Sequence, residues 1–501
     1  MKSFISFFFF IALCSRLCCA VTVAPIFSSH MVLQQGKDIV IWGTAKPSEV
    51  INVTLGKEQK TTKAKGDGNW IVRFAPRKAS KDGIDLDVND LHFTDILIGE
   101  LWLCSGQSNM AFTLKRMDGA DELIKAASIK TLRLMKYELD VPNVSKNGYT
   151  AEQLKKANVH SILKNSSWRL SDEGNASKSY AVAWLLGKKL VETLDVPVGI
   201  IMMANGGSAM NNWIAPEVLQ SNAQTAHFFT ENWLENEDVY INHRVRCRSA
   251  FKSVLKENTV YIPGKFPYRW VCEPSILFEA GIEPLKGLSF RGVLWYQGES
   301  DATNTRMAKV LFPMLISNWR DHFGQADLPF IYVQLPTYKS EDWPLFREFQ
   351  REAESKIKNT HMVSTIDLGD SKNLHPKDKQ PIGERAARLA LKYVYGYKLL
   401  GFPTLEKWEK RQNKLYLYFS EIGEGFKEWQ GEQLNGFEVG DKEGQFRAVE
   451  ANVSKDRKSI VINGISKDVE SIRYAWSGVP TPAVKLFNSD ALPLGPFLLK
   501  L

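Results

Sequence analysis

Four short polar segments of the sequence carry the residue types that ester hydrolysis needs. Ser108 lies in the segment SGQSNM, directly after the apolar run LWLC, and a serine in such a turn can be held exposed as a nucleophile. His375, in the segment NLHP, can take a proton from that serine and return it to a leaving alcohol. The paired glycines of NGGS at 205–208 and the side chain of Gln297 can donate hydrogen bonds to an oxyanion. Together the segments predict a nucleophile, a base and an oxyanion hole.

Each of these segments lies just past the end of a predicted strand. Several of the strands are continuous apolar runs, which is typical of parallel strands covered on both faces. Because strands alternate with helices, the pattern indicates an open, mostly parallel α/β sheet, and such sheets bind ligands at the carboxyl ends of their strands. We therefore expect the four segments to meet at one edge of the sheet. The predicted strands are 96–104, 198–203, 292–296, 330–335 and 362–366, and the predicted helices are 179–194, 306–323, 346–357 and 382–395.

The pattern divides the chain into three units. Residues 21–95 contain short strand candidates separated by turn residues, which predicts an N-terminal β-sandwich-like domain. Residues 96–400 form the predicted α/β catalytic domain, in which 215–289 is too long for a simple connection and is expected to be an inserted helical or lid element. Residues 401–501 return to strands, and the proline-interrupted tail from 486 onward is expected to run irregularly.

Composition and charge exclude several classes of protein. The 501 residues are 44% hydrophobic and 24% charged, ordinary values for a folded chain, which rules out collagen-like, disulfide-scaffold and intrinsically disordered proteins. The net charge of +8 arises from 64 Lys and Arg residues scattered among 56 Asp and Glu residues. Such a balance is typical of a solvated surface, so we expect no nucleic-acid partner.

The first twenty residues have the pattern of a signal peptide. Lys2 precedes an apolar run over 4–13, and small residues end at Ala20, so we expect cleavage near Ala20 and export of the chain. A retained anchor is the alternative, but the run is short for a membrane span, and no later segment is apolar enough to be one.

In an oxidising compartment Cys247 and Cys272 could pair, which would leave Cys104 as a buried thiol. No Cys/His spacing resembles a zinc site, and we expect neither a metal nor a cofactor.

These motifs, taken together, resemble those of the sialate O-acetylesterase-type branch of the SGNH/GDSL hydrolases. The resemblance implies an SGNH-like parallel sheet with helices on both faces, flanked by N-terminal and C-terminal β-sandwich-like domains. It also implies metal-free hydrolysis of O-acetyl esters on carbohydrates, with Ser108 as the nucleophile and His375 as the general base and acid. The backbone N–H groups of Ser108 and Gly207 and the Gln297 side chain would form the oxyanion hole. The matching segments are LWLCSGQSNM at 101–110, NGGS at 205–208 with Trp213, WYQGESD at 295–301, HPKDKQ at 375–380, FSSHMVLQ at 27–34 and IRYAW at 472–476.

The third member of a catalytic triad is the point where the sequence departs from the wider family. The positions three and two residues before the histidine, which often hold Asp in relatives, are Lys372 and Asn373 here. Asp370 is the nearest carboxylate in the sequence and is the favoured candidate to orient His375. The other candidates are carboxylates of a neighbouring strand end, or a backbone carbonyl that would leave a Ser–His dyad. The residues expected to support the site are Asn109, Glu299 and Asp301.

Three interpretations of the function follow from these motifs. An O-acetylated sialic acid is the leading expectation, and acetylxylan or another acetylated polysaccharide is the alternative on the same machinery. The third is a non-catalytic carbohydrate-binding protein, which the presence of both Ser108 and His375 argues against.

Overall fold

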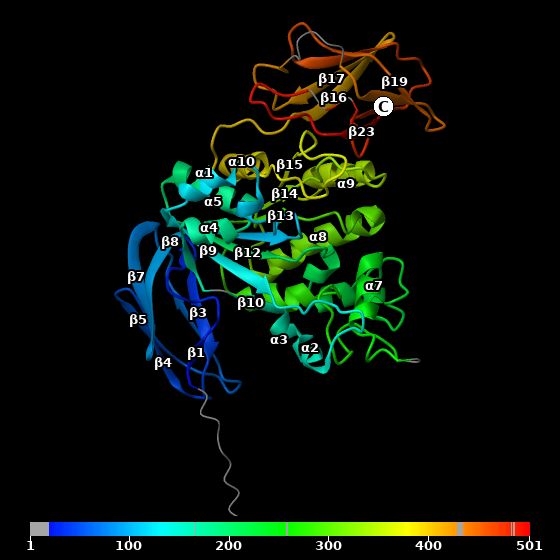
Figure 1. The fold of residues 1–501 in the computed structure, drawn as a ribbon. Helices are drawn as coiled ribbons and strands as arrows, with labels where there is room; N and C mark the ends of the chain where they lie inside the picture. The colour runs from blue at the N-terminus through cyan, green and yellow to red at the C-terminus, as the bar shows by residue number, and fades with distance from the viewer. Residues whose placement is uncertain (1–19, 166, 257–258, 428–433, 482, 484–485) are drawn as a thin grey trace, which may run out of the picture.

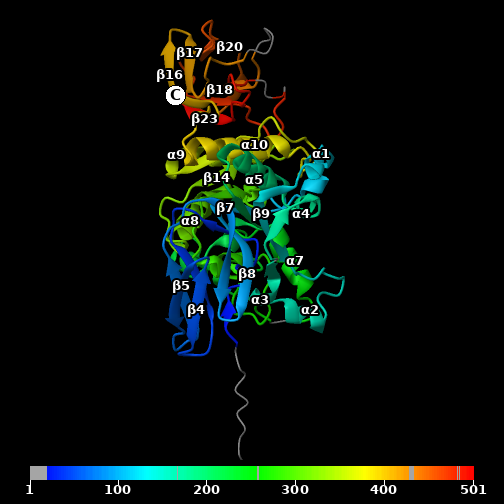
Figure 2. The same ribbon diagram turned by 90° about the vertical axis from the view of Figure 1, so that its left-hand side faces the viewer.

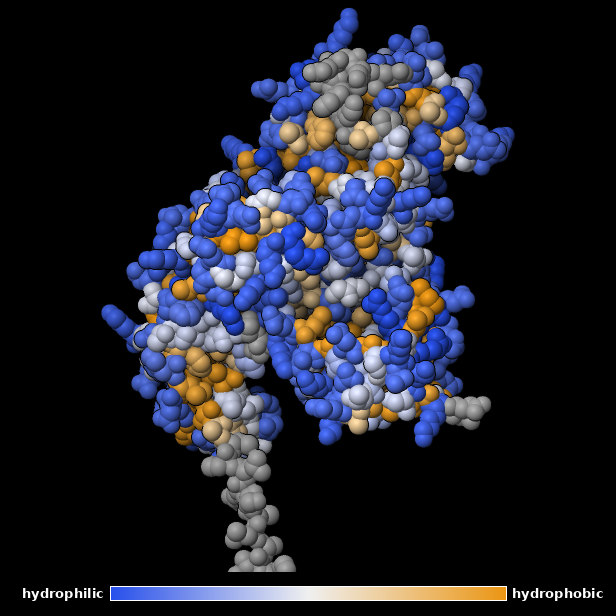
Figure 3. All heavy atoms as spheres, viewed as in Figure 1, coloured by the Kyte–Doolittle hydropathy of each residue, from blue (hydrophilic) through white to orange (hydrophobic). Residues whose placement is uncertain are grey.

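The computed structural model describes residues 20–165, 167–256, 259–427, 434–481, 483 and 486–501 (Figure 1). A central α/β part lies between an N-terminal and a C-terminal β-rich part, so the predicted fold class is confirmed. The predicted signal peptide lies outside the described residues apart from Ala20. Hydrophilic side chains dominate the face seen in Figure 3, with hydrophobic ones gathered only in small patches, as suits a scattered surface charge.

Six parallel strands form the centre of the main sheet, in the order β9-β12-β8-β13-β14-β15. Every residue of β12, β13 and β14 is buried, because helices cover the sheet on both faces. The strand β9 was not predicted, and the short strands β10 and β11 pair with it antiparallel. The bounds are β8 Leu91–Gly106, β9 Ile129–Leu139, β10 Leu163–Asn165, β11 Arg169–Ser171, β12 Val198–Ala204, β13 Gly292–Tyr296, β14 Phe330–Val333 and β15 Thr360–Val363.

Alternate residues of β8 face two different helical layers. Trp102 and Cys104 share one hydrophobic cluster with α5 and α10. Leu101 and Leu103 point to the opposite face and share a second cluster with α8 and α9. The two layers are visible in Figure 1. Their bounds are α5 Ala181–Leu194, α8 Thr305–His322, α9 Trp343–Lys356 and α10 Gln380–Leu389.

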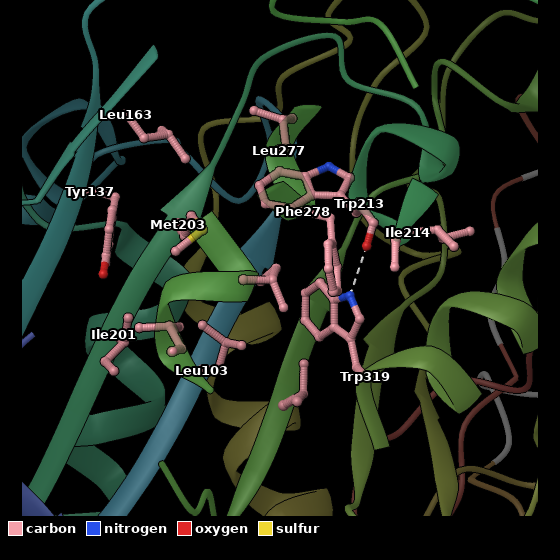
Figure 4. Close-up of a cluster of buried hydrophobic side chains, with 14 of the residues drawn as sticks. Leu103, Tyr137, Leu163, Ile201, Met203, Trp213, Ile214, Leu277, Phe278 and Trp319 are labelled. Atoms are coloured by element: carbon pink, nitrogen blue, oxygen red, sulfur yellow. Dashed lines mark hydrogen bonds between the residues drawn. The ribbon is translucent and has the colours of Figure 1, made fainter. Parts of the chain in front are cut away.

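The segment 215–289 is built of short helices that pack onto the sheet. Figure 4 shows Leu277 and Phe278 of this segment beside Met203 of β12, and all three are buried. Just before the segment, the carbonyl oxygen of Trp213 accepts a hydrogen bond from the Trp319 indole of α8 at 2.8 Å. The elements are α6 Pro216–Ser221, α7 Ile241–Ala250, and the turns Ala226–Phe229, Phe278–Ile282 and Glu283–Leu285.

The strand β8 belongs to both the N-terminal part and the central sheet. Its first half pairs with β7 and β2, and from residue 100 onward it pairs with β12 and β13. The predicted boundary between residues 95 and 96 therefore falls inside one continuous strand. The other N-terminal strands are β1 Thr22–Val23, β2 Val32–Gln34, β3 Ile39–Thr44, β4 Val50–Leu55, β5 Glu58–Lys63, β6 Asn69–Phe74 and β7 Ser80–Val88.

The C-terminal part consists of two four-stranded antiparallel sheets, β16-β17-β21-β20 and β19-β18-β22-β23, at the end of the molecule next to α9 and α10 (Figures 1 and 2). The prediction of an irregular tail is wrong at its end, because β23 pairs with β22. The strands are β16 Thr404–Arg411, β17 Lys414–Ser420, β18 Phe437–Gly440, β19 Phe446–Ala448, β20 Ala451–Val453, β21 Ser459–Asn463, β22 Ser471–Tyr474 and β23 Phe497–Lys500.

A buried arginine joins this C-terminal part to the centre. Arg347 of α9 has a fully buried side chain and, among the residues that the structure describes, pairs with no carboxylate. Its guanidinium donates to the carbonyl oxygens of Leu335 and Pro336, and also to those of Ser477 and Gly478, at 2.6–3.2 Å. Burial without a counter-ion lowers its pKa to about 9.

Cys104, Cys247 and Cys272 are free, buried thiols in the structure. The predicted pair between Cys247 and Cys272 is therefore absent from the structure. Burial raises the pKa of the Cys272 thiol to about 12, which disfavours its thiolate form. Within the described residues, none of the helices combines the length and the hydropathy required of a membrane span.

Candidate active site

The Ser108 hydroxyl and the His375 imidazole meet at the carboxyl edge of the sheet. Ser108 follows the end of β8 and His375 follows β15, and the Ser108 Oγ and His375 Nε2 atoms lie 2.7 Å apart. The turn before Ser108 needs a glycine: Gly106 has a φ of 144°, and a Cβ there would lie 2.1 Å from the Tyr296 carbonyl oxygen of β13. This close approach of two strands fixes the position of the serine.

The segment 205–208 forms a tight turn beside the serine. The Ser208 N–H donates to the Asn205 carbonyl at 3.1 Å, and Gly207 has a φ of 77°, as the third position of a type II turn requires. A Cβ on Gly206 would lie 3.6 Å from the Cβ of Ser108, so the turn flanks the nucleophile directly. In the described part of the chain, the N–H groups of Ser108 and Gly207 donate to no protein acceptor and are available to an oxyanion.

The peptide between Gly207 and Ser208 is held from two sides through the Gly207 carbonyl. Its carbonyl oxygen accepts a 2.6 Å hydrogen bond from the His243 Nε2 of α7 and a 2.9 Å bond from the Ser300 hydroxyl. Burial lowers the pKa of His243 to about 4, so this imidazole is neutral and carries its hydrogen on Nε2. His243 was not among the predicted site residues, because nothing in the sequence around it marks it as a partner of a distant turn.

Gln297 lies in the site, but its amide hydrogens are already used. The Nε2 atom donates to the Ser208 carbonyl at 3.0 Å and to the Asp301 carboxylate, while the Oε1 atom is buried without a partner. Asp301 also accepts the Met210 N–H at 3.1 Å, and burial raises its pKa to about 7. Asp301 therefore orients Gln297 rather than His375. Donation by Gln297 to an oxyanion requires one of its hydrogens to leave its present acceptor.

The Asp370 carboxylate does not reach His375. Its Oδ1 atom accepts the N–H groups of Lys372 and Asn373, both at 2.7 Å, which closes a local Asx-type turn. The Asn373 side chain in turn accepts the His375 N–H at 3.0 Å. Over the described residues, no carboxylate contacts the His375 ring, so the arrangement is that of a Ser–His pair.

Burial lowers the pKa of His375, and the positive charges of Lys379 and Arg116 lower it further. A neutral imidazole is the form that can accept the Ser108 proton. The site thus keeps its base in the competent state at neutral pH without a carboxylate partner.

A buried polar network lies behind the pair. The Asn109 Nδ2 atom donates to the Leu374 carbonyl at 3.0 Å and to the Glu299 carboxylate, while its Oδ1 atom accepts from the Lys379 ammonium at 2.6 Å. Lys379 is fully buried, and desolvation lowers its pKa to about 7. Burial raises the pKa of Glu299. Lys379 was not predicted, although its place in HPKDKQ, four residues after the histidine, was a signal that could have found it.

The arrangement can perform acyl transfer through a nucleophile, a neutral base and free amide donors. Where the chain is described, no group of three or more His, Cys, Asp or Glu residues is placed so that it could hold a metal ion.

Comparisons with known proteins all find carbohydrate acetylesterases. Residues 261–393 match a family model described as carbohydrate esterase, sialic acid-specific acetylesterase. The chain is 30% identical over 530 residues to the sialate O-acetylesterase of Homo sapiens, which covers 95% of this chain and 92% of the human protein. It is 29% identical over 524 residues to the mouse enzyme of that name, over 95% and 93% of the two chains. A solved carbohydrate acetylesterase from Xanthomonas citri superposes with a TM-score of 0.75 at 25% identity, over 96% of this chain and 99% of that one.

Proposed function

This chain belongs to the sialate O-acetylesterase family, and from that membership and the 2.7 Å contact between Ser108 and His375 we propose that it deacetylates O-acetylated sialic acid through an acetyl-Ser108 intermediate. The chain is a carboxylic-ester hydrolase that removes O-acetyl groups from carbohydrates. That activity leaves no place for the alternative of a non-catalytic carbohydrate-binding protein.

In the first half-reaction the Ser108 Oγ atom attacks the acetyl carbonyl carbon while the His375 Nε2 atom takes the hydroxyl proton. The tetrahedral intermediate carries its negative charge on the former carbonyl oxygen. When it collapses, the bond to the sugar oxygen breaks, and His375 gives its proton to that oxygen. The products of this stage are the free sugar hydroxyl and acetyl-Ser108.

In the second half-reaction a water molecule attacks acetyl-Ser108, and His375 accepts the proton of that water. The second tetrahedral intermediate collapses to acetate, and His375 returns the proton to the Ser108 oxygen. The imidazole is neutral at the start of both halves, which its lowered pKa favours.

The free N–H groups of Ser108 and Gly207 support their assignment as the principal oxyanion donors. Gln297 is proposed as a third donor that gives up its contact with Asp301 when substrate enters. The hydrogen bonds from His243 and Ser300 to the Gly207 carbonyl, with the bond from the Ser208 N–H to Asn205, hold the peptide between Gly207 and Ser208. They stabilise the turn that carries the Gly207 N–H, which supports an oxyanion hole that exists before the charge develops.

We assign Asp370 a structural role in the turn 370–375, and we assign Ser108 and His375 the role of a catalytic dyad.

We also propose that residues 1–20 are a signal peptide and that the chain is exported. Sequencing the N-terminus of the exported protein tests this second proposal: a mature chain that begins near Val21 supports it, and a retained residue 1 contradicts it.

The decisive experiment measures acetate release from O-acetylated sialic acid, acetylated xylan and 4-nitrophenyl acetate by the wild type and by Ser108→Ala. We expect the substitution to lower kcat by at least about 1,000-fold, as the loss of a covalent nucleophile does. Ser105→Ala is the matched control, since this serine lies three residues earlier in β8 and its buried hydroxyl has no hydrogen-bond partner among the described residues. Unchanged turnover by Ser108→Ala contradicts the mechanism, and faster release from xylan than from sialic acid contradicts the substrate.

A further inference from the structure

An exposed arginine, Arg116, borders the site, and no described residue forms an ion pair with it. Arg116 ends the short helical turn Leu114–Arg116, and its guanidinium carbon lies 4.4 Å from the centre of the Phe112 ring. The Lys379 ammonium lies 5.1 Å from the centre of the same ring. Because Lys379 is bonded to Asn109, the neighbour of Ser108, a single aromatic ring separates Arg116 from the network behind the nucleophile.

A second contact places this segment against the loop that carries the base. The Asp118 N–H donates to the Lys377 carbonyl at 3.3 Å, two residues after His375. The charge of Arg116 also lowers the pKa of both His375 and Lys379, so its field reaches the reacting groups. Arg116 therefore stands at the rim of the site, close to the His375 side.

The guanidinium of Arg116 differs from several others in this molecule, which are held by carboxylates. Arg133, Arg385 and Arg473 each form a two-pronged contact with a carboxylate, at 2.6–3.2 Å. Arg116 is exposed, and within the described residues its side chain bonds to no carboxylate or carbonyl. Stacking on Phe112 holds the planar group in place while leaving its N–H donors to solvent.

The chemistry that fits such a group is a carboxylate. A guanidinium binds a carboxylate through two parallel hydrogen bonds, whereas a neutral sugar offers it no charge. Sialic acid carries a carboxylate on the same molecule as the acetylated hydroxyl. The acetylated xylose units of xylan carry no carboxylate. A cation at the rim, rather than at the reacting centre, suits a carboxylate that is several bonds away from the ester.

We propose that Arg116 binds the carboxylate of the acetylated sugar and thereby selects sialic acid over neutral acetylated glycans. This inference rests on the proposed function of Ser108 and His375 and names the group that sets its substrate class. The bound carboxylate also offsets the positive field that Arg116 exerts on His375.

The experiment compares O-acetylated sialic acid with its methyl ester, in which the carboxylate is masked. For each variant the readout is the ratio of kcat/KM for the acid to kcat/KM for the methyl ester, so that a partly misfolded preparation lowers both values and leaves the ratio intact. We expect Arg116→Met to lower this ratio by about 10- to 100-fold, the usual worth of a charged bidentate contact. The ratio for Arg116→Lys should lie between those of the wild type and Arg116→Met, because lysine keeps the positive charge but cannot donate two parallel hydrogen bonds.

Lys115→Met is the matched control, an exposed cation one residue earlier that we expect to keep the wild-type ratio. A ratio unchanged in Arg116→Met, or lowered equally in Lys115→Met, overturns the inference. Wild-type enzyme that releases acetate from xylan but not from sialic acid overturns it as well, while leaving the esterase mechanism standing. Unchanged turnover of 4-nitrophenyl acetate by Ser108→Ala is the separate result that would remove the proposed mechanism.

Discussion

The Asn109 side chain donates a 3.0 Å hydrogen bond to the carbonyl oxygen of Leu374. The residue after the nucleophile is thereby tied to the residue before the base, although 265 positions separate them in the chain. Lys379 and Glu299 bond to the two ends of the same amide and hold it in one orientation. The alignment of Ser108 with His375 thus depends on the buried Asn109 side chain, which takes no part in the chemical steps.

Asn109→Ala removes this tie, and we expect kcat for 4-nitrophenyl acetate to fall by about 10- to 100-fold, since small misplacements of reacting groups cost that much. KM should change less than kcat, because the substrate does not need Asn109 to bind. Asn158→Ala, which removes a helix-capping side chain elsewhere, is the control. Equal kinetics of Asn109→Ala and the wild type would show that the two loops align without the tie.

Asp370→Asn should change kcat by no more than about threefold. The Asn side chain keeps an oxygen that can accept the N–H groups of Lys372 and Asn373, and no charge next to His375 is lost. Asp370→Ala removes that acceptor and should lower activity more, by loosening the His375 loop. A triad carboxylate, in contrast, is worth about 10,000-fold in kcat. A loss of that size in Asp370→Asn would restore Asp370 to the triad.

The pH dependence of kcat/KM should follow the lowered pKa of His375. Activity requires the neutral imidazole, so it falls as pH drops through this pKa, and burial together with Lys379 and Arg116 places the fall below the ordinary histidine range. Arg116→Met removes one of the charges that disfavour the imidazolium form. The acid limb for 4-nitrophenyl acetate should therefore move to higher pH. A shift to lower pH, or an equal shift in Lys115→Met, would contradict this electrostatic link.

Arg347→Met should loosen the C-terminal part. The substitution removes a donor that the carbonyl oxygens of residues 335, 336, 477 and 478 share, although Pro336 and Gly478 keep a second donor in Trp343 and Tyr338. We expect a loss of about 3 kcal/mol of stability. The thermal midpoint and the rate of proteolysis between residues 401 and 501 measure the effect. Arg351→Met, one turn away on α9 and bonded to Glu348, is the control and should cost less. Equal midpoints for the two variants would refute the anchoring role.

The positions of Ser108 and His375 could be predicted from sequence because parallel strands deliver their following turns to one edge. Five strands were predicted in this part of the chain, several of them from continuous apolar runs, and a strand is present at each place. The strand β9 was missed because its segment IKTLRLMKYEL mixes charged and apolar residues instead of forming a continuous apolar run. The antiparallel pairing of β23 with β22 was missed because prolines precede it.

The partners of the site residues could not be predicted in the same way. Asp370 is close to His375 in sequence, but a carboxylate two or three residues before free N–H groups closes a turn on itself. Gln297 is placed as a donor, yet the neighbouring carbonyl of Ser208 and the Asp301 carboxylate take its hydrogens. Such competition among nearby acceptors is decided by distances of a few tenths of an ångström, which residue types do not encode.

The shared strand β8 has a consequence for any attempt to shorten this enzyme. Its residues 91–99 are paired with N-terminal strands, and the same backbone then runs on to the turn that holds Ser108. Deleting the first 95 residues would sever that strand and strip its first half of every partner. The turn that carries Ser108 would then follow a strand whose N-terminal half has no pairing partner. The N-terminal part is thus not a detachable accessory, and the smallest active fragment must retain it.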